Sequence, residues 1–287
     1  MGRVAAFAAL LVGVFAGAAL LGGAIDPAGS DADVETGEHR STGAGTTDTH
    51  AGDESAEAPP GLQTAQGGYR LILNRTRLTE GQPRARIDFR IVDRAGWPLH
   101  EFERSHEKRM HFIVVRRDLS SFQHLHPTMG PDGTWSARVD LSEGGVYRVF
   151  ADFTRDGDQR TLGADVHVGD RYRPEALAQP RPTAQTERGL TVTLDSDGVR
   201  AGAAGRVGFQ VRDGGEPVND RLEPYLGAKG HLVALREGDL AYLHTHPEGG
   251  ELAFMTEYPS AGAYRLFVQF RYQGKVHTAA FTQQVPR

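Results

Sequence analysis

Two segments of the chain repeat one pattern of histidines. A histidine is followed, after twelve residues, by the tetrapeptide His-x-His-Pro, first from 111 to 127 and again from 231 to 247. A spacing kept to the residue in two otherwise diverged segments indicates that the three imidazoles of each segment belong to one local structure. Clustered imidazoles are a frequent way to hold a transition metal. The candidate metal ligands are therefore His111, His124 and His126 in the first segment and His231, His244 and His246 in the second.

Neighbouring residues predict that each set lies on a β-hairpin. In the first set, an apolar run that starts at Met110 is typical of a strand buried on both faces, and the chain turns near Asp118. Antiparallel pairing about this turn places His111 opposite His126, with His124 two residues along on the same face. Opposed Cβ atoms lie about 5 Å apart and diagonal ones about 7 Å apart, so three imidazoles could share one ion.

The second segment gives the same register from different residues. Its turn contains Gly238, a residue that tight hairpins prefer, and a turn centred just after it pairs His231 with His246. A slip of one residue would move the imidazoles to the other face of the strand pair. Proline cannot donate to a β-ladder, so Pro127 and Pro247 are expected to end their strands.

The chemistry of the ligands indicates which ion they would hold. Neutral imidazoles suit Cu(II) or Zn(II), and the affinity order of divalent ions puts copper first. Cu(I) prefers soft sulfur, and the nearby thioethers are those of Met110, Met129 and Met255. Without an ion, the histidines would simply cap strand ends and bond to carbonyl or carboxylate oxygens. Their repetition at a fixed spacing favours metal binding, with a copper ion as the first choice and zinc as the second.

Four further histidines have no counterpart in the other segment. We expect them at the surface, where His106 and His277 could support the ion indirectly, through a contact with a ligand. The four are His100, His106, His167 and His277.

The composition narrows the possible functions. The chain has 287 residues, no cysteine and a formal net charge of -5. This length allows two domains, each with its own core. The absence of cysteine excludes disulfides, thiolate zinc sites, blue-copper centres and thiol catalysis. No stripe of Lys and Arg interleaved with aromatic residues occurs, so nucleic acid is not an expected partner.

The amino-terminal part predicts export. Arg3 precedes an apolar run from Val4 to Ile25, and acidic residues follow at once, an order that places the bulk of the chain outside the cytoplasm. Residues 1–25 are thus a signal peptide or a transmembrane anchor; both the secreted and the membrane-anchored forms stay open, and the lack of cysteine excludes a lipoprotein. Residues 26–66 contain almost no large apolar side chains and predict a disordered linker.

The remainder of the chain reads as all-β. Short alternating segments rich in Val, Ile, Phe and Tyr are separated by Gly, Pro, Asp and Asn, and no amphipathic helix is evident. The two halves align at an offset of 120 residues through the histidines and 117 afterwards. We therefore expect two tandem immunoglobulin-like β-sandwich modules, at 67–170 and 186–287, joined by a proline-containing linker at 171–185.

These segments resemble a known group of proteins. The strand that contains Met110 and His111, the Asp-Leu pairs at 118–119 and 239–240, and the two His-x-His-Pro tetrapeptides look like duplicated segments of exported bacterial proteins of uncertain function. Those proteins are loosely similar to the periplasmic copper-handling β-sandwiches of the CopC type. The resemblance covers both modules and implies a sandwich fold and copper handling. The chain lacks a recognisable amino-terminal histidine or methionine cluster of the kind that CopC-type carriers often use.

Two other classes of protein compete with this interpretation. Gly238, the pair His244 and His246, and Glu251 resemble the first motif of a cupin metalloenzyme, but Tyr258 stands where its closing glycine is expected and a second motif is absent. The other alternative is a metal-free structural or interaction module of the cell surface.

The sequence as a whole favours a metal-binding protein without enzymatic activity. No paired general acid and base, no ordered Ser/His/Asp set and no phosphate-binding glycine loop is evident. We expect an extracytoplasmic protein that acts as a buffer, carrier or sensor through a three-histidine site in each module. The expected partners are the metal ion and, through the amino-terminal segment, a membrane; no protein partner is identified by the sequence.

Overall fold

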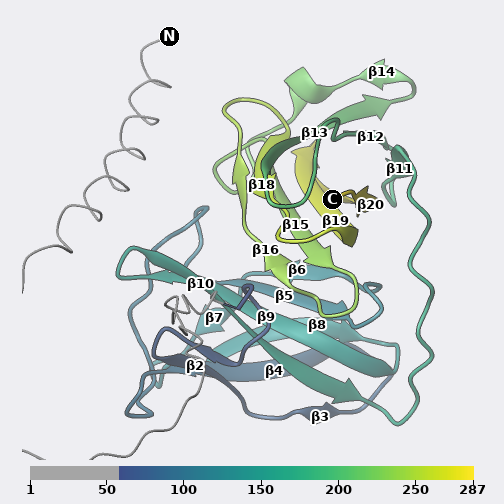
Figure 1. Ribbon diagram of the computed structural model, residues 1–287. Coiled ribbons are helices and arrows are strands. Elements are labelled where there is room, and N and C mark those ends of the chain that lie inside the picture. Colours follow the sequence, from purple (N-terminus) through teal and green to yellow (C-terminus); the bar gives the residue numbers. More distant parts are fainter. Residues whose placement is uncertain (1–57) are drawn as a thin grey trace, which may run out of the picture. The chain divides into compact units, whose positions relative to one another are not determined.

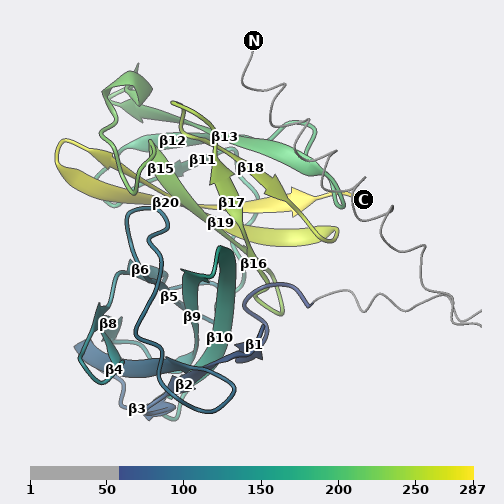
Figure 2. The same ribbon diagram turned by 90° about the vertical axis from the view of Figure 1, so that its left-hand side faces the viewer.

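The structure, a computed structural model, describes residues 58–287, and these form two β-sandwiches in tandem (Figures 1 and 2). The predicted signal peptide or anchor at 1–25 and the predicted linker up to residue 57 lie outside the described residues. Between 58 and 287 we find no helix with the length and apolar character needed to cross a membrane.

The first sandwich is built from two five-stranded sheets. One sheet has the order β1 (Ala65–Gln66), β2 (Tyr69–Leu73), β4 (Gln82–Val92), β8 (Trp135–Leu141) and β7 (Thr128–Met129). The other has the order β3 (Arg77–Leu78), β10 (Asp158–Val168), β9 (Gly145–Arg155), β5 (His111–Arg116) and β6 (Gln123–Leu125). All of these pairs are antiparallel except β3 with β10.

The second sandwich repeats this plan. One sheet has the order β11 (Thr183–Gln185), β12 (Thr191–Asp195), β13 (Ala204–Asp213), β18 (Ala253–Glu257) and β17 (Thr245–Pro247), with β14 (Glu216–Pro217) also paired to β13. The other has the order β16 (Tyr242–Leu243), β15 (Gly230–Arg236), β19 (Gly262–Tyr272) and β20 (Lys275–Val285). A single 3-10 turn, η1 (Asn219–Arg221), precedes β15.

A tyrosine hydrogen bond marks the same corner in both sandwiches. Tyr147 donates its hydroxyl to the carbonyl of Glu143, and Tyr264 donates to the carbonyl of Ser260, each at 2.9 Å. A tyrosine that bonds back to the backbone a few residues upstream is typical of immunoglobulin-like sandwiches. The repeated corner supports the predicted fold class, all-β with two tandem immunoglobulin-like modules.

The predicted register of both hairpins is confirmed. Ile113 pairs with His124 across β5 and β6, and Ala234 pairs with Leu243 across β15 and β16. Each turn places a leucine, Leu119 or Leu240, at a positive φ of 65° or 62°. Hairpin position and side-chain parity therefore follow from the sequence alone.

Successive residues of β5 face two different apolar environments. Phe112 and Val114 belong to the core of the first sandwich, whereas Ile113 and Val115 belong to a cluster that also contains residues of the second sandwich. Because side chains alternate along a strand, His111 shares its face with Ile113 and Val115. The strand is buried on both faces, as the apolar run predicts.

The shared cluster packs the two sandwiches against each other, sheet on sheet. On the second sandwich, Val233 and Leu235 of β15 enter it, so His231 shares that face. The rings of Phe122 and Phe267 stack across it with centroids 4.0 Å apart. The full set is Ile113, Val115, Leu119, Phe150, Val233, Leu235, Leu240, Tyr242 and Phe267, with Phe122, Leu177 and Ala280 at its edge.

The first sandwich begins earlier than predicted. Gly61 donates to the carbonyl of Thr161 at 2.8 Å, and Arg148 donates to the carbonyl of Gly61 at 2.6 Å, so residues that we assigned to the linker are bound to β9 and β10. Gly61 has a φ of +77°, and a Cβ there would lie 2.7 Å from the ring of Phe150. Backbone pairing of a segment with few apolar side chains leaves no hydrophobic signal in the sequence.

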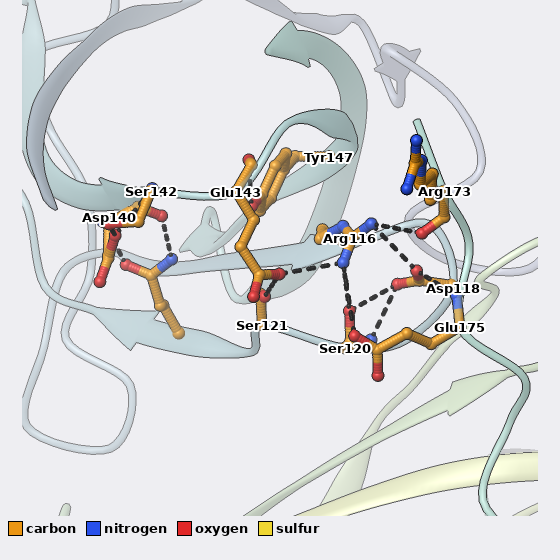
Figure 3. A network of polar contacts seen from close by, with 11 residues as sticks. Arg116, Asp118, Ser120, Ser121, Asp140, Ser142, Glu143, Tyr147, Arg173 and Glu175 are labelled. Carbon is orange, nitrogen blue, oxygen red and sulfur yellow. Dashed lines mark hydrogen bonds and ion pairs between the residues drawn. The ribbon is translucent and has the colours of Figure 1, made fainter. Parts of the chain in front are cut away.

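The connection between the sandwiches is tied to the first one by Arg116 (Figure 3). This buried guanidinium donates to the carbonyl of Arg173 at 2.9 Å and to the carboxylate of Glu143 at 3.0 Å. The backbone N–H of Glu175 donates to Asp118 at 2.9 Å. The start of the predicted linker at 171–185 is therefore fixed beside the turn that follows β5.

Candidate metal centre

Three histidines from both sandwiches converge at the junction. His111 of β5, His124 of β6 and His231 of β15 each offer one ring nitrogen, and these atoms all lie within 4.8 Å of one another. The rings of His111 and His231 are stacked, with centroids 5.3 Å apart and planes 9° apart. The ring of His124 lies 4.6 Å from that of His231. The first sandwich thus supplies two of these histidines and the second sandwich supplies the third.

Hydrogen bonds to the outer ring atoms fix the tautomers of two of these histidines. Nε2 of His111 lies 3.0 Å from the carbonyl oxygen of Ser105, and Nδ1 of His124 lies 2.7 Å from Oε1 of Gln269. Both oxygens accept, so both nitrogens carry the hydrogen and donate. In a neutral imidazole the other nitrogen then bears a lone pair. These two atoms, Nδ1 of His111 and Nε2 of His124, lie 3.0 Å apart.

The amide of Gln269 is itself oriented. Its Nε2 donates to Oγ1 of Thr278 at 3.0 Å, which turns Oε1 toward His124. Gln269 lies on β19 directly opposite His231 of β15. The second sandwich therefore supplies one member of the cluster and also the group that orients a member from the first sandwich.

Burial keeps His124, His126 and His231 neutral. Burial, followed by the neighbouring imidazoles, holds the pKa values of His124 and His231 well below the usual range. Burial, then His111 and Lys108, lowers the pKa of His126 to about 4. Neutral imidazole is the form that binds a metal. His124, His126 and His231 are thus in their ligating form at neutral pH.

Two more histidines surround these three. The ring of His126 lies 5.1 Å from that of His111 and 4.8 Å from that of His124, and its Nε2 is buried without a hydrogen-bond partner among residues 58–287. Nδ1 of His231 is likewise buried without a hydrogen-bond partner among the described residues. The ring of His106 lies 6.0 Å from His111 and 5.7 Å from His231. His126 offers a fourth ring nitrogen to the group, and His106 borders it.

The donor set fits a divalent transition metal. Zinc–nitrogen bonds of about 2.0–2.1 Å and tetrahedral geometry place ligand nitrogens about 3.3 Å apart. The 3.0 Å contact is close to that spacing, and the 4.8 Å limit on the others requires only small ring movements. Hydrogen bonds from the outer nitrogens to oxygen atoms are the usual way of orienting metal-binding histidines.

The remaining predicted ligands lie elsewhere. We expected His231, His244 and His246 to form a second group of three, but β16 ends at Leu243 and the chain then joins the opposite sheet as β17. There His246 pairs with Met255 of β18 and is exposed. In the first sandwich β6 continues to Leu125 before the chain crosses to β7, so His124 stays beside His111.

The four unmatched histidines have different environments. His100 and His167 are exposed, as predicted, whereas His277 is buried and stacks on Phe270 with centroids 5.6 Å apart. The surface prediction was therefore wrong for His277, which lies in the second core. His106 is half-buried beside the cluster.

Sequence reasoning missed the polar residues that face the junction from β9 and β19. Asp152 and Gln269 are buried at aligned positions, 117 residues apart, within runs that are otherwise apolar. Asp152 accepts from Thr161 at 2.9 Å and lies directly opposite His111, as Gln269 lies opposite His231. A lone polar residue in an apolar strand was the available signal.

Fold and site together define a class: a two-module, all-β protein with a cluster of imidazoles where its immunoglobulin-like sandwiches meet. Within that class, the chain belongs to the family described as Domain of unknown function (DUF8832), which matches residues 63–170 and 184–287. The two matched ranges, one for each sandwich, confirm the internal repeat. No protein with a curated description matches the chain.

The solved structures that match the chain are distant from it. The Salmonella alpha-2-macroglobulin reacted with methylamine is 12% identical over 79% of this chain and 15% of that chain, with a TM-score of 0.27. A chimeric titin Z1Z2 is 16% identical over 76% of this chain and 97% of that chain, with a TM-score of 0.20. Invasin, a bacterial integrin-binding protein, is 13% identical over 74% and 39%, with a TM-score of 0.22. The resemblance to CopC-type proteins remains a prediction.

Proposed function

We propose that this protein binds a divalent transition metal at the imidazole cluster shared by its two sandwiches. The proposed ligands are Nδ1 of His111, Nε2 of His124 and the ring of His231, with His126 as the fourth. Copper is the first choice and zinc the second. The proposed role is that of a buffer, carrier or sensor outside the cytoplasm, and the location rests on the amino-terminal sequence alone.

The contact between His111 and His124 carries this proposal. Nδ1 of His111 and Nε2 of His124 lie 3.0 Å apart. The other nitrogen of each ring donates a hydrogen bond to an oxygen, so both of the facing nitrogens carry a lone pair. Two lone pairs at that distance repel each other unless a cation, either a proton or a metal ion, lies between them. A shared proton would add a positive charge to a buried group that the surroundings favour as neutral. A metal ion would use the lone pairs of all the ligands at once.

The donor set supports the choice of ion. All the proposed ligands are imidazole nitrogens, and the chain has no cysteine. Nitrogen donors suit Cu(II) and Zn(II), and Cu(II) forms the stronger complexes of the two where geometry allows. Four imidazoles leave Zn(II) with a closed tetrahedral shell, and a closed shell is typical of a holding site.

Metal titration of the full chain tests the proposal. The chain would be purified without an affinity tag and titrated with Zn(II), and then with Cu(II), against a competing chelator. We expect one tightly bound ion, and His231→Ala should weaken binding by at least about 100-fold because a ligand is lost. His167→Ala, which changes an exposed histidine outside the cluster, is the matched control and should bind as wild type does.

The outcome that overturns the proposal is equally specific. If wild type and His231→Ala bind with equal affinity, the junction is not a metal site. The 3.0 Å contact would then hold a proton, and the junction would be a metal-free packing contact between the sandwiches.

A further inference from the structure

The histidines left out of the cluster lie around a second cavity. His244 and His246 both line a hollow of about 470 Å³ on the second sandwich, next to the amino-terminal segment at Pro60. Met255 lines the same hollow. The cavity thus brings together two imidazoles and the thioether of one of only four methionines in the chain.

Strand pairing brings His246 and Met255 together. They are directly opposed across β17 and β18, so their side chains leave the same face of the sheet with Cβ atoms about 5 Å apart. Phe254 on the other face packs into the core, so Met255 points away from it. Met255 is half-buried, and no core packing requires a thioether at that position.

His244 borders the same cavity. Its Nδ1 is buried and has no hydrogen-bond partner within the described part of the chain. The pKa of His244 is lowered, and burial is the largest cause. The carboxylate of Asp152 opposes this shift, and the imidazole of His246 adds to it. His244 and His246 thus border the same cavity, and His244 presents a buried nitrogen that has no hydrogen-bond partner among the described residues.

The charges around the cavity do not exclude a cation. Glu257 lines the cavity and is exposed. Arg206 is opposite Met255 on β13, but its guanidinium is held by Glu248 at 2.8 Å and Glu251 at 2.5 Å, and it does not line the cavity. Its positive charge is thus compensated on the far side of Met255.

We infer that His244, His246 and Met255 form a second metal site, distinct from the cluster at the junction, which takes a soft monovalent ion such as Cu(I) or its analogue Ag(I). Two imidazoles and a thioether are the kind of donors that monovalent copper and silver prefer, whereas an all-imidazole site suits divalent ions. One chain would then hold ions of two oxidation states in two separate sites.

Silver titration of the full chain tests this inference. Ag(I) has a filled d shell and does not change oxidation state during the measurement. We expect Met255→Leu, which keeps the side-chain volume, to weaken Ag(I) binding by at least about tenfold and to leave Zn(II) binding unchanged. Met129→Leu is the matched control, because Met129 packs against the first core, and it should bind Ag(I) as wild type does.

A second measurement keeps the inference testable if a variant is unstable. In wild type labelled at its methionine methyl groups, Ag(I) should shift the NMR signal of Met255 and leave that of Met129 in place. Equal Ag(I) affinity in wild type and Met255→Leu, or an Ag(I) shift absent from the Met255 methyl group, overturns the inference. Loss of Ag(I) binding in His231→Ala would place the silver at the junction and would also overturn it. None of these three outcomes bears on Zn(II) at the junction, so the two proposals fail separately.

Discussion

The two histidine segments have the same spacing but different structural fates. In the first, β6 stays beside β5 until Leu125, and His124 faces His111 at 3.0 Å. In the second, β16 ends at Leu243, and His246 moves to the opposite sheet beside Met255. The difference teaches that a spacing repeated within one chain fixes the register of a hairpin. It does not fix which other side chains each histidine contacts. A change of about two residues in where the strand crosses over separates a shared cluster from a separate cavity.

The largest expected effect comes from disrupting the packed face that brings the segments together. Val233→Asp would place a charge in the apolar cluster between the sandwiches, where Val233 is fully buried. An uncompensated buried charge costs about 3–5 kcal/mol, so we expect urea denaturation to show a loss of that size and Zn(II) affinity to fall with it. Val276→Asp, at a residue that is 41% exposed, is the control and should change neither quantity. An unchanged Zn(II) affinity in Val233→Asp would show that the site does not need the junction.

The next effect compares two aligned positions directly. His124→Ala should weaken Zn(II) binding by about 100-fold, because it removes a ligand that faces His111. His244→Ala changes the equivalent residue of the second segment and should leave Zn(II) affinity within about threefold of wild type. Competition titrations of both variants measure the contrast. Equal losses would mean that the segments work as two similar sites, and the comparison would fail.

A smaller effect is expected at the residues behind the ligands. Gln269→Ala removes the oxygen that orients His124 and should weaken Zn(II) binding by about 10–100-fold, with the ligands themselves intact. Asp152→Asn, at the aligned position of the first sandwich, should have little effect, because the hydrogen bond to His124 comes from Gln269. If the two variants rank in the opposite order, the carboxylate rather than the amide supports the ion.

The smallest expected effect is the pH dependence of stability in the metal-free protein. The folded pKa of His126 is lowered to about 4, and those of His124 and His231 are lowered as well, whereas the unfolded values lie near 6.5. Between these limits the unfolded chain binds more protons, so stability is fully present above the unfolded value and is lost as pH falls. Thermal unfolding at pH 7.5 and pH 5 should therefore show a lower Tm in acid. The shift should be smaller in His126→Ala, and an equal shift would assign the acid sensitivity to other groups.

Local features of the sequence predicted the fold and the register well. Alternation of apolar residues gave the strands, and the turn near Asp118 gave the pairing of Ile113 with His124. Parity then placed all three histidines of the first segment on one face. These properties depend on residues close together in the chain, and that is why they could be read from it.

The grouping of ligands was not predicted because it depends on packing between distant segments. The signal was present in part: Ile113 and Val115 are as apolar as Phe112 and Val114, so β5 needed a cover on both faces. Nothing in the sequence indicated that the second face of β5 packs against the equivalent face of β15 in the other sandwich. The early crossover after Leu243 is also a long-range effect, since it is decided by pairing with β18.

The position of the imidazole cluster has a consequence for how the two halves of the molecule are coupled. An ion bound there would crosslink two sandwiches that the chain joins only through the connection between β10 and β11. Linkage is reciprocal, so the ion would strengthen the docking by the same free energy that docking adds to its affinity. Doubling the length of that connection would cost only about 0.6 kcal/mol, or roughly threefold in affinity. A force that pulls the two sandwiches apart would therefore release the ion far more effectively than a longer connection between them would.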